Sequence, residues 1–107
     1  MKIETIDITA HEYFDKINGN TYFNANIYIN YNSPDALKIH IPFEYGHSNQ
    51  YIQAALIKLK KLNYINTERP LWEYCKENNI ALRRQKIEGF KERELKQQDK
   101  ELIALTL

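Results

Sequence analysis

The residues of this chain that are best suited to bind a ligand or partner are its cations, which are concentrated in the C-terminal half. Residues 54–107 carry twelve Lys or Arg against eight acidic residues, whereas residues 1–53 carry three Lys against six acidic residues. Such a division of charge predicts two electrically distinct surfaces, and the basic one suits contact with phosphates. We assign a nucleic-acid or partner-binding role to Arg83, Arg84, Lys86, Lys91, Arg93, Lys96, Lys58 and Lys61.

Residues 83–86 are the centre of this predicted basic surface. If they are extended, alternation sends Arg84 and Lys86 to one face and Arg83 to the other. In an alternative interpretation, neighbouring acids pair with the cations and leave an ordinary mixed surface. The acids in question are Glu88, Glu92 and Glu94.

A second candidate surface combines tyrosines with asparagines. Tyr22 and Tyr28 share one face of an expected strand with Asn24, Asn26 and Asn30. Sheets that display aromatic rings can stack unpaired bases, and tyrosine is also enriched at protein interfaces. The remaining interpretation is a solvated face of cross-strand pairs. No segment matches the aromatic-and-glycine consensus of the common RNA-recognition strands, so the face names no ligand.

Patterns typical of catalysis or metal binding are weak. His11, His40 and His47 lack the helical i,i+4 spacing and the cysteine partners of zinc sites. Cys75 would need a nearby base to act as a nucleophile, and its place on the inner side of an expected helix favours a buried, apolar role. The three glycines are isolated, so no phosphate-binding loop is expected. We predict no catalytic residue, no metal and no cofactor.

Two strongly alternating segments between residues 21 and 45 must support these surfaces. A period of two places one sheet face in a core and the other toward water or a partner. The apolar faces of the two segments are Phe23, Ala25, Ile27, Ile29 and Tyr31, and then Leu37, Ile39, Ile41, Phe43 and Tyr45. Shorter extended segments are expected before them, at residues 3–8 and 11–17.

Turn residues predict how these strands connect. The pair Asn18 and Gly19 is typical of a type I′ hairpin turn, which needs positive φ at both central positions. Residues 32–35, Asn-Ser-Pro-Asp, predict the second turn. Pro42 has no N–H to donate, so it belongs near a strand end, on an edge strand or at a bulge. Gly46 is expected to end this part of the sheet.

Helical patterns follow residue 46. Apolar residues repeat at three and four in residues 49–62, which predicts a helix packed on the apolar sheet face. A second helix is expected between Thr67 and Asn78. Its inner side is expected to consist of Leu71, Trp72 and Cys75.

The last quarter of the chain is less strongly patterned. Residues 80–87 look extended, and residues 91–105 favour helix by propensity, with a middle that is expected to be solvated. Residues 102–107 are too apolar for a free tail, so we expect them to dock within the chain or across a homodimer.

Composition bounds the class of protein. The chain has 107 residues, 43% hydrophobic and 27% charged, which suits a single domain spanning residues 1–107. Its sequence contains no bilayer-length apolar run and no signal-peptide pattern, and its one cysteine forms no intramolecular disulfide. We expect a cytoplasmic protein with no membrane contact. The predicted fold class is α+β: an antiparallel β-meander of three or more strands with one helix packed on it, followed by a basic helical and extended C-terminal half.

Several short runs resemble small phage and prophage proteins of unassigned function. The runs are Asn20-Thr21-Tyr22-Phe23, Pro42-Phe43-Glu44-Tyr45-Gly46, Tyr51 followed by Ala54-Ala55-Leu56, and Lys91-Glu92-Arg93-Glu94-Leu95-Lys96. The resemblance implies a compact accessory protein that is carried by a mobile element and acts in the host bacterial cytoplasm. Small proteins of that kind are often inhibitors of bacterial defence systems, anti-CRISPR proteins among them.

Three functional hypotheses follow. The leading one is a non-enzymatic binding protein that acts on RNA, DNA or a bacterial defence nucleoprotein such as a CRISPR effector, through residues 83–96 and the tyrosine face. The alternative is a homo-oligomeric phage structural or assembly protein closed through residues 102–107. The third, an enzyme that uses Cys75 with a histidine, has the least support in the residues.

Overall fold

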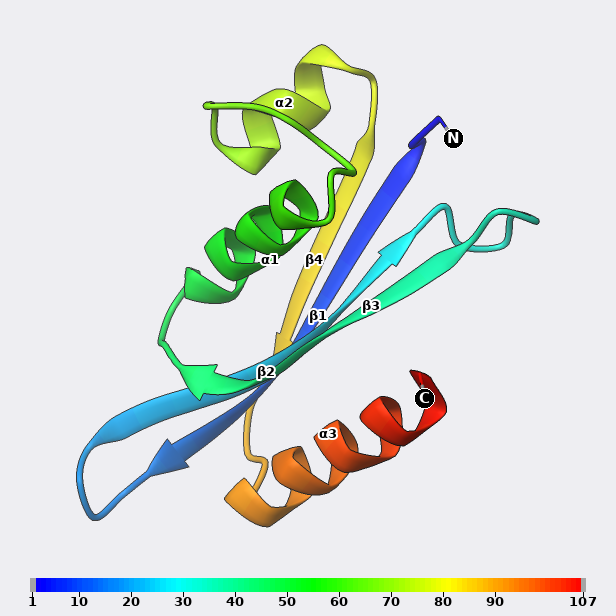
Figure 1. Ribbon diagram of the computed structural model, residues 1–107. Coiled ribbons are helices and arrows are strands. Elements are labelled where there is room, and N and C mark those ends of the chain that lie inside the picture. Colours follow the sequence, from blue (N-terminus) through cyan, green and yellow to red (C-terminus); the bar gives the residue numbers. More distant parts are fainter. Residues whose placement is uncertain (1, 107) are drawn as a thin grey trace.

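Within residues 2–106, four strands form one mixed sheet that is flanked by three helices in the computed structural model (Figure 1). The structure describes the backbone of residues 2–106 and the side chains of residues 2–102. The elements are β1 (Thr5–Asp15), β2 (Asn20–Ile29), β3 (Leu37–Tyr45), α1 (Gln50–Lys61), α2 (Leu71–Glu77), β4 (Ala81–Ile87) and α3 (Glu92–Thr106). Helices α1 and α2 lie on one side of the sheet and α3 on the other (Figure 1). The predicted α+β class is confirmed.

The sheet is not a pure meander, which corrects the sequence prediction. Strands β1, β2 and β3 pair antiparallel in chain order, but β4 adds beside β1 and runs parallel to it, so the spatial order is β3-β2-β1-β4. The two edge strands, β3 and β4, therefore run in the same direction, and α1 and α2 carry the chain across one sheet face between them (Figure 1). The sequence predicts that residues 80–87 are extended. Which strand they pair with depends on where the crossover through α1 and α2 ends, which the local sequence does not specify.

The apolar core lies between the sheet and helices α1 and α2. The largest part of its sheet face comes from β1 and β2, and the helices contribute one residue per turn. The buried members are Ile6, Ile8, Ala10, Phe23, Ala25, Ile27, Ile29, Ile41, Tyr51, Ala55, Leu59, Ile65, Leu71, Cys75 and Ile80. Burial of each large apolar side chain contributes about 1.5–3 kcal/mol before chain entropy is counted. This core holds α1 and α2 against the sheet and so positions the groove described below.

A β-bulge in β3 reverses the sheet face to which the side chains at the end of that strand point. The pairing of β3 with β2 shifts next to Asn24, so Pro42 and Phe43 together oppose that one residue. Pro42 thus lies at a bulge on an edge strand, as predicted from its missing N–H. The prediction that Phe43 and Tyr45 belong to the apolar face is wrong, because the extra residue reverses the alternation beyond it. Phe43 instead stacks on Tyr22, with ring centroids 5.0 Å apart.

The hairpin between β1 and β2 has a longer loop than the predicted two-residue type I′ turn. Gly19 has a positive φ of 69°, but Asn18 does not, and the Gly19 N–H donates to the Asp15 carbonyl (2.8 Å). The Asp15 carboxylate accepts hydrogen bonds from the Ile17 N–H and from the backbone and side chain of Asn18. The bond from the Asn18 side chain is the main reason that the pKa of Asp15 is lowered. The residues before this loop form one continuous strand where two extended segments were expected.

Helix α3 covers the polar face of the sheet. The prediction of a helix in residues 91–105 is confirmed, but its middle is not solvated, because Leu95 and Asp99 are buried. Its backbone is helical through Thr106. We expected residues 102–107 to dock, but most of their side chains lie outside the described residues. Among the helices described, none is long and apolar enough to cross a membrane.

Candidate functional site

The central cations of the predicted basic surface lie on both faces of β4. Arg84 and Lys86 lie on the α1 side and Arg83 on the α3 side, as the alternation predicts. Arg83 Nε lies 2.6 Å from Asp7 Oδ1, and its guanidinium lies over the Tyr31 ring (4.6 Å to the centroid). A hydrogen bond to Tyr31, with the Asp7 carboxylate, raises the pKa of Arg83. Within the described chain, Arg83 is thus already engaged by groups of its own sheet.

Other predicted cations also have acidic neighbours. Lys86 Nζ lies 3.2 Å from Glu12 Oε2, and Lys96 Nζ lies 2.6 Å from Glu92 Oε1. The mixed-surface interpretation therefore describes these side chains, although the acids at Arg83 and Lys86 come from β1 rather than from residues 88–94. The remaining cations do not converge with them. Lys58 and Lys61 lie on α1, Lys91 lines a hollow beneath the β1–β2 hairpin, and Arg93 lies on the outer side of α3.

The tyrosines of the second candidate surface are separated by α3. Tyr22 belongs to an aromatic cluster at one end of the sheet, where it stacks on Phe43 and contacts Tyr13 and Tyr45. Tyr28 lies toward the other end, with Lys38 Nζ 5.6 Å from its ring centroid. Asn24 and Asn26, which lie between them, are buried rather than displayed, and so is Asn30 beyond Tyr28. The face therefore does not form one continuous platform.

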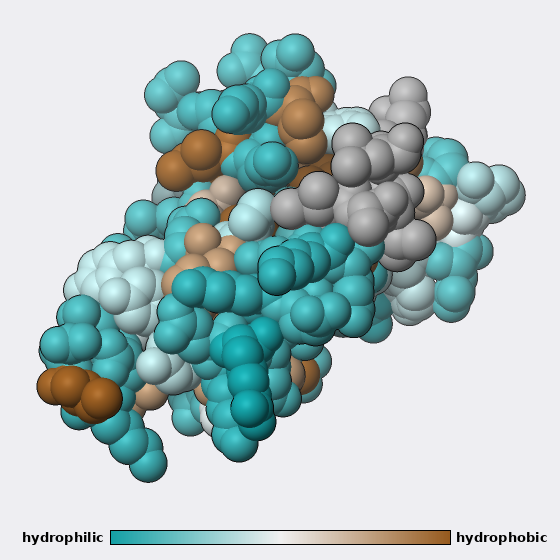
Figure 2. Space-filling view, turned by 60° about the horizontal axis from the view of Figure 1, so that its bottom comes forward, coloured by the Kyte–Doolittle hydropathy of each residue, from teal (hydrophilic) through white to brown (hydrophobic). Residues whose placement is uncertain are grey.

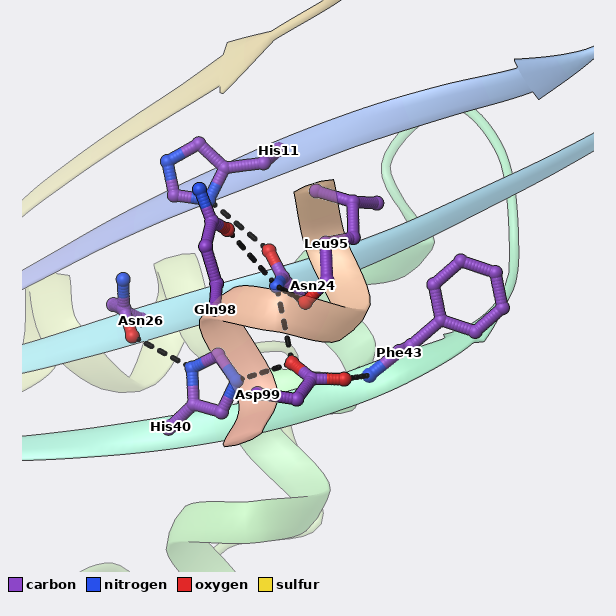
Figure 3. A network of polar contacts seen from close by, with 8 residues as sticks. All are labelled: His11, Asn24, Asn26, His40, Phe43, Leu95, Gln98 and Asp99. Carbon is purple, nitrogen blue, oxygen red and sulfur yellow. Dashed lines mark hydrogen bonds and ion pairs between the residues drawn. The ribbon is translucent and has the colours of Figure 1, made fainter. Parts of the chain in front are cut away.

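Asn24 and Asn26 form a polar network with His11 and His40 beneath α3 (Figure 3). Asn24 is fully buried, and its Nδ2 lies 3.2 Å from the Leu95 carbonyl, 3.1 Å from Gln98 Oε1 and 3.1 Å from Asp99 Oδ1. Its Oδ1 lies 3.1 Å from His11 Nδ1. Asn24 thus joins β1 and β2 to α3.

Asp99 accepts hydrogen bonds from two strands of the sheet. His40 Nε2 lies 2.6 Å from Asp99 Oδ1, and the Phe43 N–H donates to Asp99 Oδ2 (2.9 Å) (Figure 3). The other ring nitrogen of His40, Nδ1, lies 2.8 Å from Asn26 Oδ1. Sequence reasoning missed this network. The available signal was the i,i+4 spacing of Leu95 and Asp99, which places both on the same side of α3.

A groove with a volume of about 530 Å³ lies between α1, α2 and β4. Its walls are Asn49, Ile52, Gln53, Leu56, Ile57, Glu68, Arg69, Pro70, Leu71, Trp72 and Arg84. Two large apolar side chains at this groove are exposed, Ile57 by 66% and Trp72 by 57%. Arg84 is exposed at the β4 side, and within the described residues no acidic side chain forms an ion pair with it. We call this the α1–α2 groove.

The exposure of Trp72 corrects the sequence prediction. Trp72 was expected on the inner side of its helix with Leu71 and Cys75, but only the latter two are buried. Positions i and i+4 share a helix face, whereas position i+1 is turned by about 100°. Ile57 likewise lies away from the buried stripe of α1. The sequence signal that could have indicated the groove is that Ile57 and Trp72, two large apolar residues, lie at helix positions outside the buried stripes.

Figure 2 shows apolar surface in two places, on the layer of α1 and α2 and at the end of the β1–β2 hairpin, with hydrophilic surface over α3 between them. The exposed apolar residues of the hairpin end are Phe14 and Ile17, the second of which is 93% exposed. The hollow beside that hairpin is lined by charges of both signs, including Glu12, Lys16 and Glu88. The surface of the α1–α2 groove is more apolar than that of this hollow, so the groove is the stronger candidate for an apolar ligand surface.

No group of three His, Cys, Asp or Glu side chains within the described residues is placed to hold a metal ion. Cys75 lies in the core, and burial raises the pKa of its thiol to about 11. The thiol is therefore protonated at neutral pH, which does not suit a nucleophile.

The Cys75 thiol predicts a loss of stability at alkaline pH. In the unfolded chain it ionises near its ordinary pKa of 9, whereas the folded protein retains the proton up to about pH 11. The unfolded state therefore binds fewer protons between these values, and the free energy of unfolding falls as pH rises, by about 3 kcal/mol in all. Urea denaturation of wild type and Cys75→Ala at a series of pH values measures the difference. Parallel profiles for the two proteins between pH 8 and 11 would contradict the assignment.

Comparison of the chain with family models, with curated proteins and with solved structures found no match. The α1–α2 groove, with its exposed Trp72, Ile57 and Arg84, is the candidate functional site.

Proposed function

We propose that this protein is a non-enzymatic binding protein that captures a protein partner at the α1–α2 groove. The observation that carries the proposal is the exposure of Trp72 and Ile57 at a groove that also presents Arg84. Trp and Arg are enriched among the residues that dominate binding energy at protein interfaces, especially where they border a pocket. Large exposed apolar side chains rimmed by polar ones mark such interfaces on soluble proteins.

A protein partner fits this site better than a nucleic acid. The exposed surface of the groove is more apolar than polar, and Arg69 at its rim is paired with Glu73 and Glu77, each at 2.7 Å. Phosphate binding gains from several cations that converge on one face. Here Arg83, Lys86 and Lys96 have acidic neighbours, so the basic surface expected from the sequence supports the nucleic-acid hypothesis less well.

The partner implied by the phage-protein resemblance is a bacterial defence nucleoprotein. The protein component of such an assembly can occupy an apolar groove with one cation at its border, whereas its nucleic acid needs no such groove. We therefore propose that this chain inhibits or modulates a defence protein by binding it, and that the bound nucleic acid takes no direct part.

A capture experiment with paired surface variants tests the proposal. The bait is the full-length protein on beads, exposed to lysate of bacteria that carry a defence system, with and without nuclease. The groove variant combines Trp72→Ala with Ile57→Ser. The matched control combines Phe14→Ser with Ile17→Ser, which removes the same number of exposed apolar side chains from the hairpin end. We expect wild type and control to retain the same proteins after nuclease, and the groove variant to lose them.

Two results would contradict the proposal. In the first, the groove variant retains the same proteins as wild type although circular dichroism shows that it is folded. In the second, nuclease removes all captured proteins, and both variants bind RNA or DNA oligonucleotides equally. The second result would favour the basic-surface hypothesis instead, and an Arg83→Glu, Arg84→Glu, Lys86→Glu variant would then lose the bound oligonucleotide.

A further inference from the structure

We propose that the partner binds as an additional β-strand along the open edge of β4, using a segment that carries a carboxylate and apolar side chains on the sheet face that it shares with Arg84. This inference rests on the proposed function and specifies how the partner is recognised. It rests on four observations about the two sheet edges, the charges along β4 and the position of the α1–α2 groove.

The outer edge of β4 is unpaired within the described chain. β4 pairs with β1 in an unbroken parallel register, from Ala81 beside Thr5 to Ile87 beside His11. The Ala81 N–H donates to the Glu4 carbonyl (3.0 Å), so Ala81 points toward β1. Because backbone groups alternate in direction along a strand, the N–H and C=O groups of Leu82, Arg84 and Lys86 point to the open edge. These are the groups that an added strand uses.

The other edge of the sheet is protected in three ways that β4 lacks. Pro42 in β3 has no N–H, the bulge beside it interrupts the regular ladder, and the next N–H, that of Phe43, donates to Asp99 of α3. Prolines, bulges and covering elements are the devices by which proteins block strand addition. The residues of β4 include no proline and no bulge. The asymmetry assigns strand addition to β4.

Charge selects the occupant of that edge. A second copy of the chain would bring its own Arg83, Arg84 and Lys86 beside the same basic strand, and like charges on neighbouring strands destabilise a sheet. An acidic strand at this edge would instead place opposite charges next to each other. Arg84 is exposed and within the described residues has no ion-pair partner, so it is available to a carboxylate on a neighbouring strand.

The groove explains the apolar half of the segment. Arg84 belongs to the groove wall, so side chains of an added strand that share its sheet face point toward the groove. Exposed Trp72 and Ile57 are then the surfaces that apolar side chains of the partner contact. Backbone hydrogen bonds from β4 supply affinity, and the groove supplies selectivity.

Backbone methylation of a bound peptide tests strand addition directly. The probe is a displayed library of random peptides, selected on the full-length wild-type protein. The enriched peptide is synthesised with a fluorescent label, and N-methyl groups are placed on one alternate set of its backbone nitrogens or on the other. An added strand directs only every second N–H toward β4. We expect one set to weaken binding by about tenfold or more per methyl group and the other set to leave the dissociation constant nearly unchanged.

Variants of the protein give a second measurement. Arg84→Pro removes an outward N–H at a position where an edge strand tolerates proline, and Arg84→Ala removes the side chain alone. We expect Arg84→Pro to weaken peptide binding beyond Arg84→Ala, with unchanged far-ultraviolet circular dichroism for both. If Arg84→Pro fails to fold, the methylated peptides still decide the question.

The outcomes separate this inference from the proposed function. If the peptides lose binding in the groove variant but respond equally to both methylation sets, the groove function holds and strand addition is overturned. If no enriched peptide depends on the groove or on β4, both are overturned. Enrichment of basic instead of acidic peptides, a dimer mass in light scattering that Arg84→Pro abolishes, or displacement of the peptide by a short RNA would each also overturn the assignment of an acidic protein strand.

Discussion

Replacement of Asp99 with alanine is expected to lower the free energy of unfolding by about 3–5 kcal/mol, because each buried donor that loses its hydrogen-bond acceptor costs about 1–3 kcal/mol. The Asp99 carboxylate is the common acceptor of three groups that come from two strands: Asn24 Nδ2, His40 Nε2 and the Phe43 N–H. Alanine leaves all three without this acceptor in a region from which water is largely excluded. Urea denaturation followed by far-ultraviolet circular dichroism measures the loss.

The matched control is Glu101→Ala on the same helix. Glu101 is exposed, with Gln97 as its partner at 3.3 Å, so its replacement removes a carboxylate without opening the network. We expect a change within about 0.5 kcal/mol, as for most surface substitutions. Hydrogen exchange adds a local measurement: Asp99→Ala should speed exchange of the α3 amides more than those of β2. Equal effects of the two substitutions on stability and on exchange would show that the network does not anchor α3.

Replacement of Gly46 with alanine is expected to destabilise the protein by about 3 kcal/mol, at the upper end of the range for an overpacked core. An added Cβ would lie 2.7 Å from Phe23 Cε1 and 3.0 Å from Gln50 Oε1. The Phe23 ring is part of the core and almost fully buried, so it has little room to move away. The helix-start residue Gln50 would be displaced as well. Thermal or urea unfolding of the purified variant gives the value.

Two further proteins separate overpacking from backbone strain. Gly19→Ala places its Cβ in open space but at a φ of 69°, so it should cost only about 1 kcal/mol. Gly46→Ala combined with Phe23→Leu should be less destabilised than the sum of the two single substitutions, because the smaller side chain makes room for the methyl group. Additive effects in the double variant, or a Gly46→Ala cost no larger than that of Gly19→Ala, would be inconsistent with the clash.

Local patterns predicted most elements of the fold. The alternation around Ile27 and Ile39 identified β2 and β3, and the three-and-four repeat through Ala55 and Leu59 identified α1. The missing N–H of Pro42 predicted a strand end, an edge strand or a bulge, and the structure has a bulge on an edge strand there. These signals are local because side-chain direction follows from backbone period within a single element. The same logic failed at Phe43, since a bulge reverses the period without leaving a mark that hydrophobicity can detect.

The candidate site was predicted less well. Arg84 was identified from charge and was placed on the correct face, but Trp72 was assigned to the core because large aromatic residues usually contribute to it. Its exposure depends on the rotation of a short helix whose buried positions, Leu71 and Cys75, were already occupied. Asp99 was overlooked because an acidic residue in a highly charged helix is normally solvated.

The sequence by itself determined the α+β class, the faces of the central strands and the positions of the helices, because these depend on neighbours along the chain. Only the tertiary structure decided that β4 joins β1 as a parallel edge strand, that α3 buries Asn24 and Asp99, and that Ile57 and Trp72 remain exposed at one groove. Each of these outcomes depends on which segments distant in the chain meet. Hydrophobic burial is non-directional, so it requires that apolar faces be covered without naming the segment that covers them.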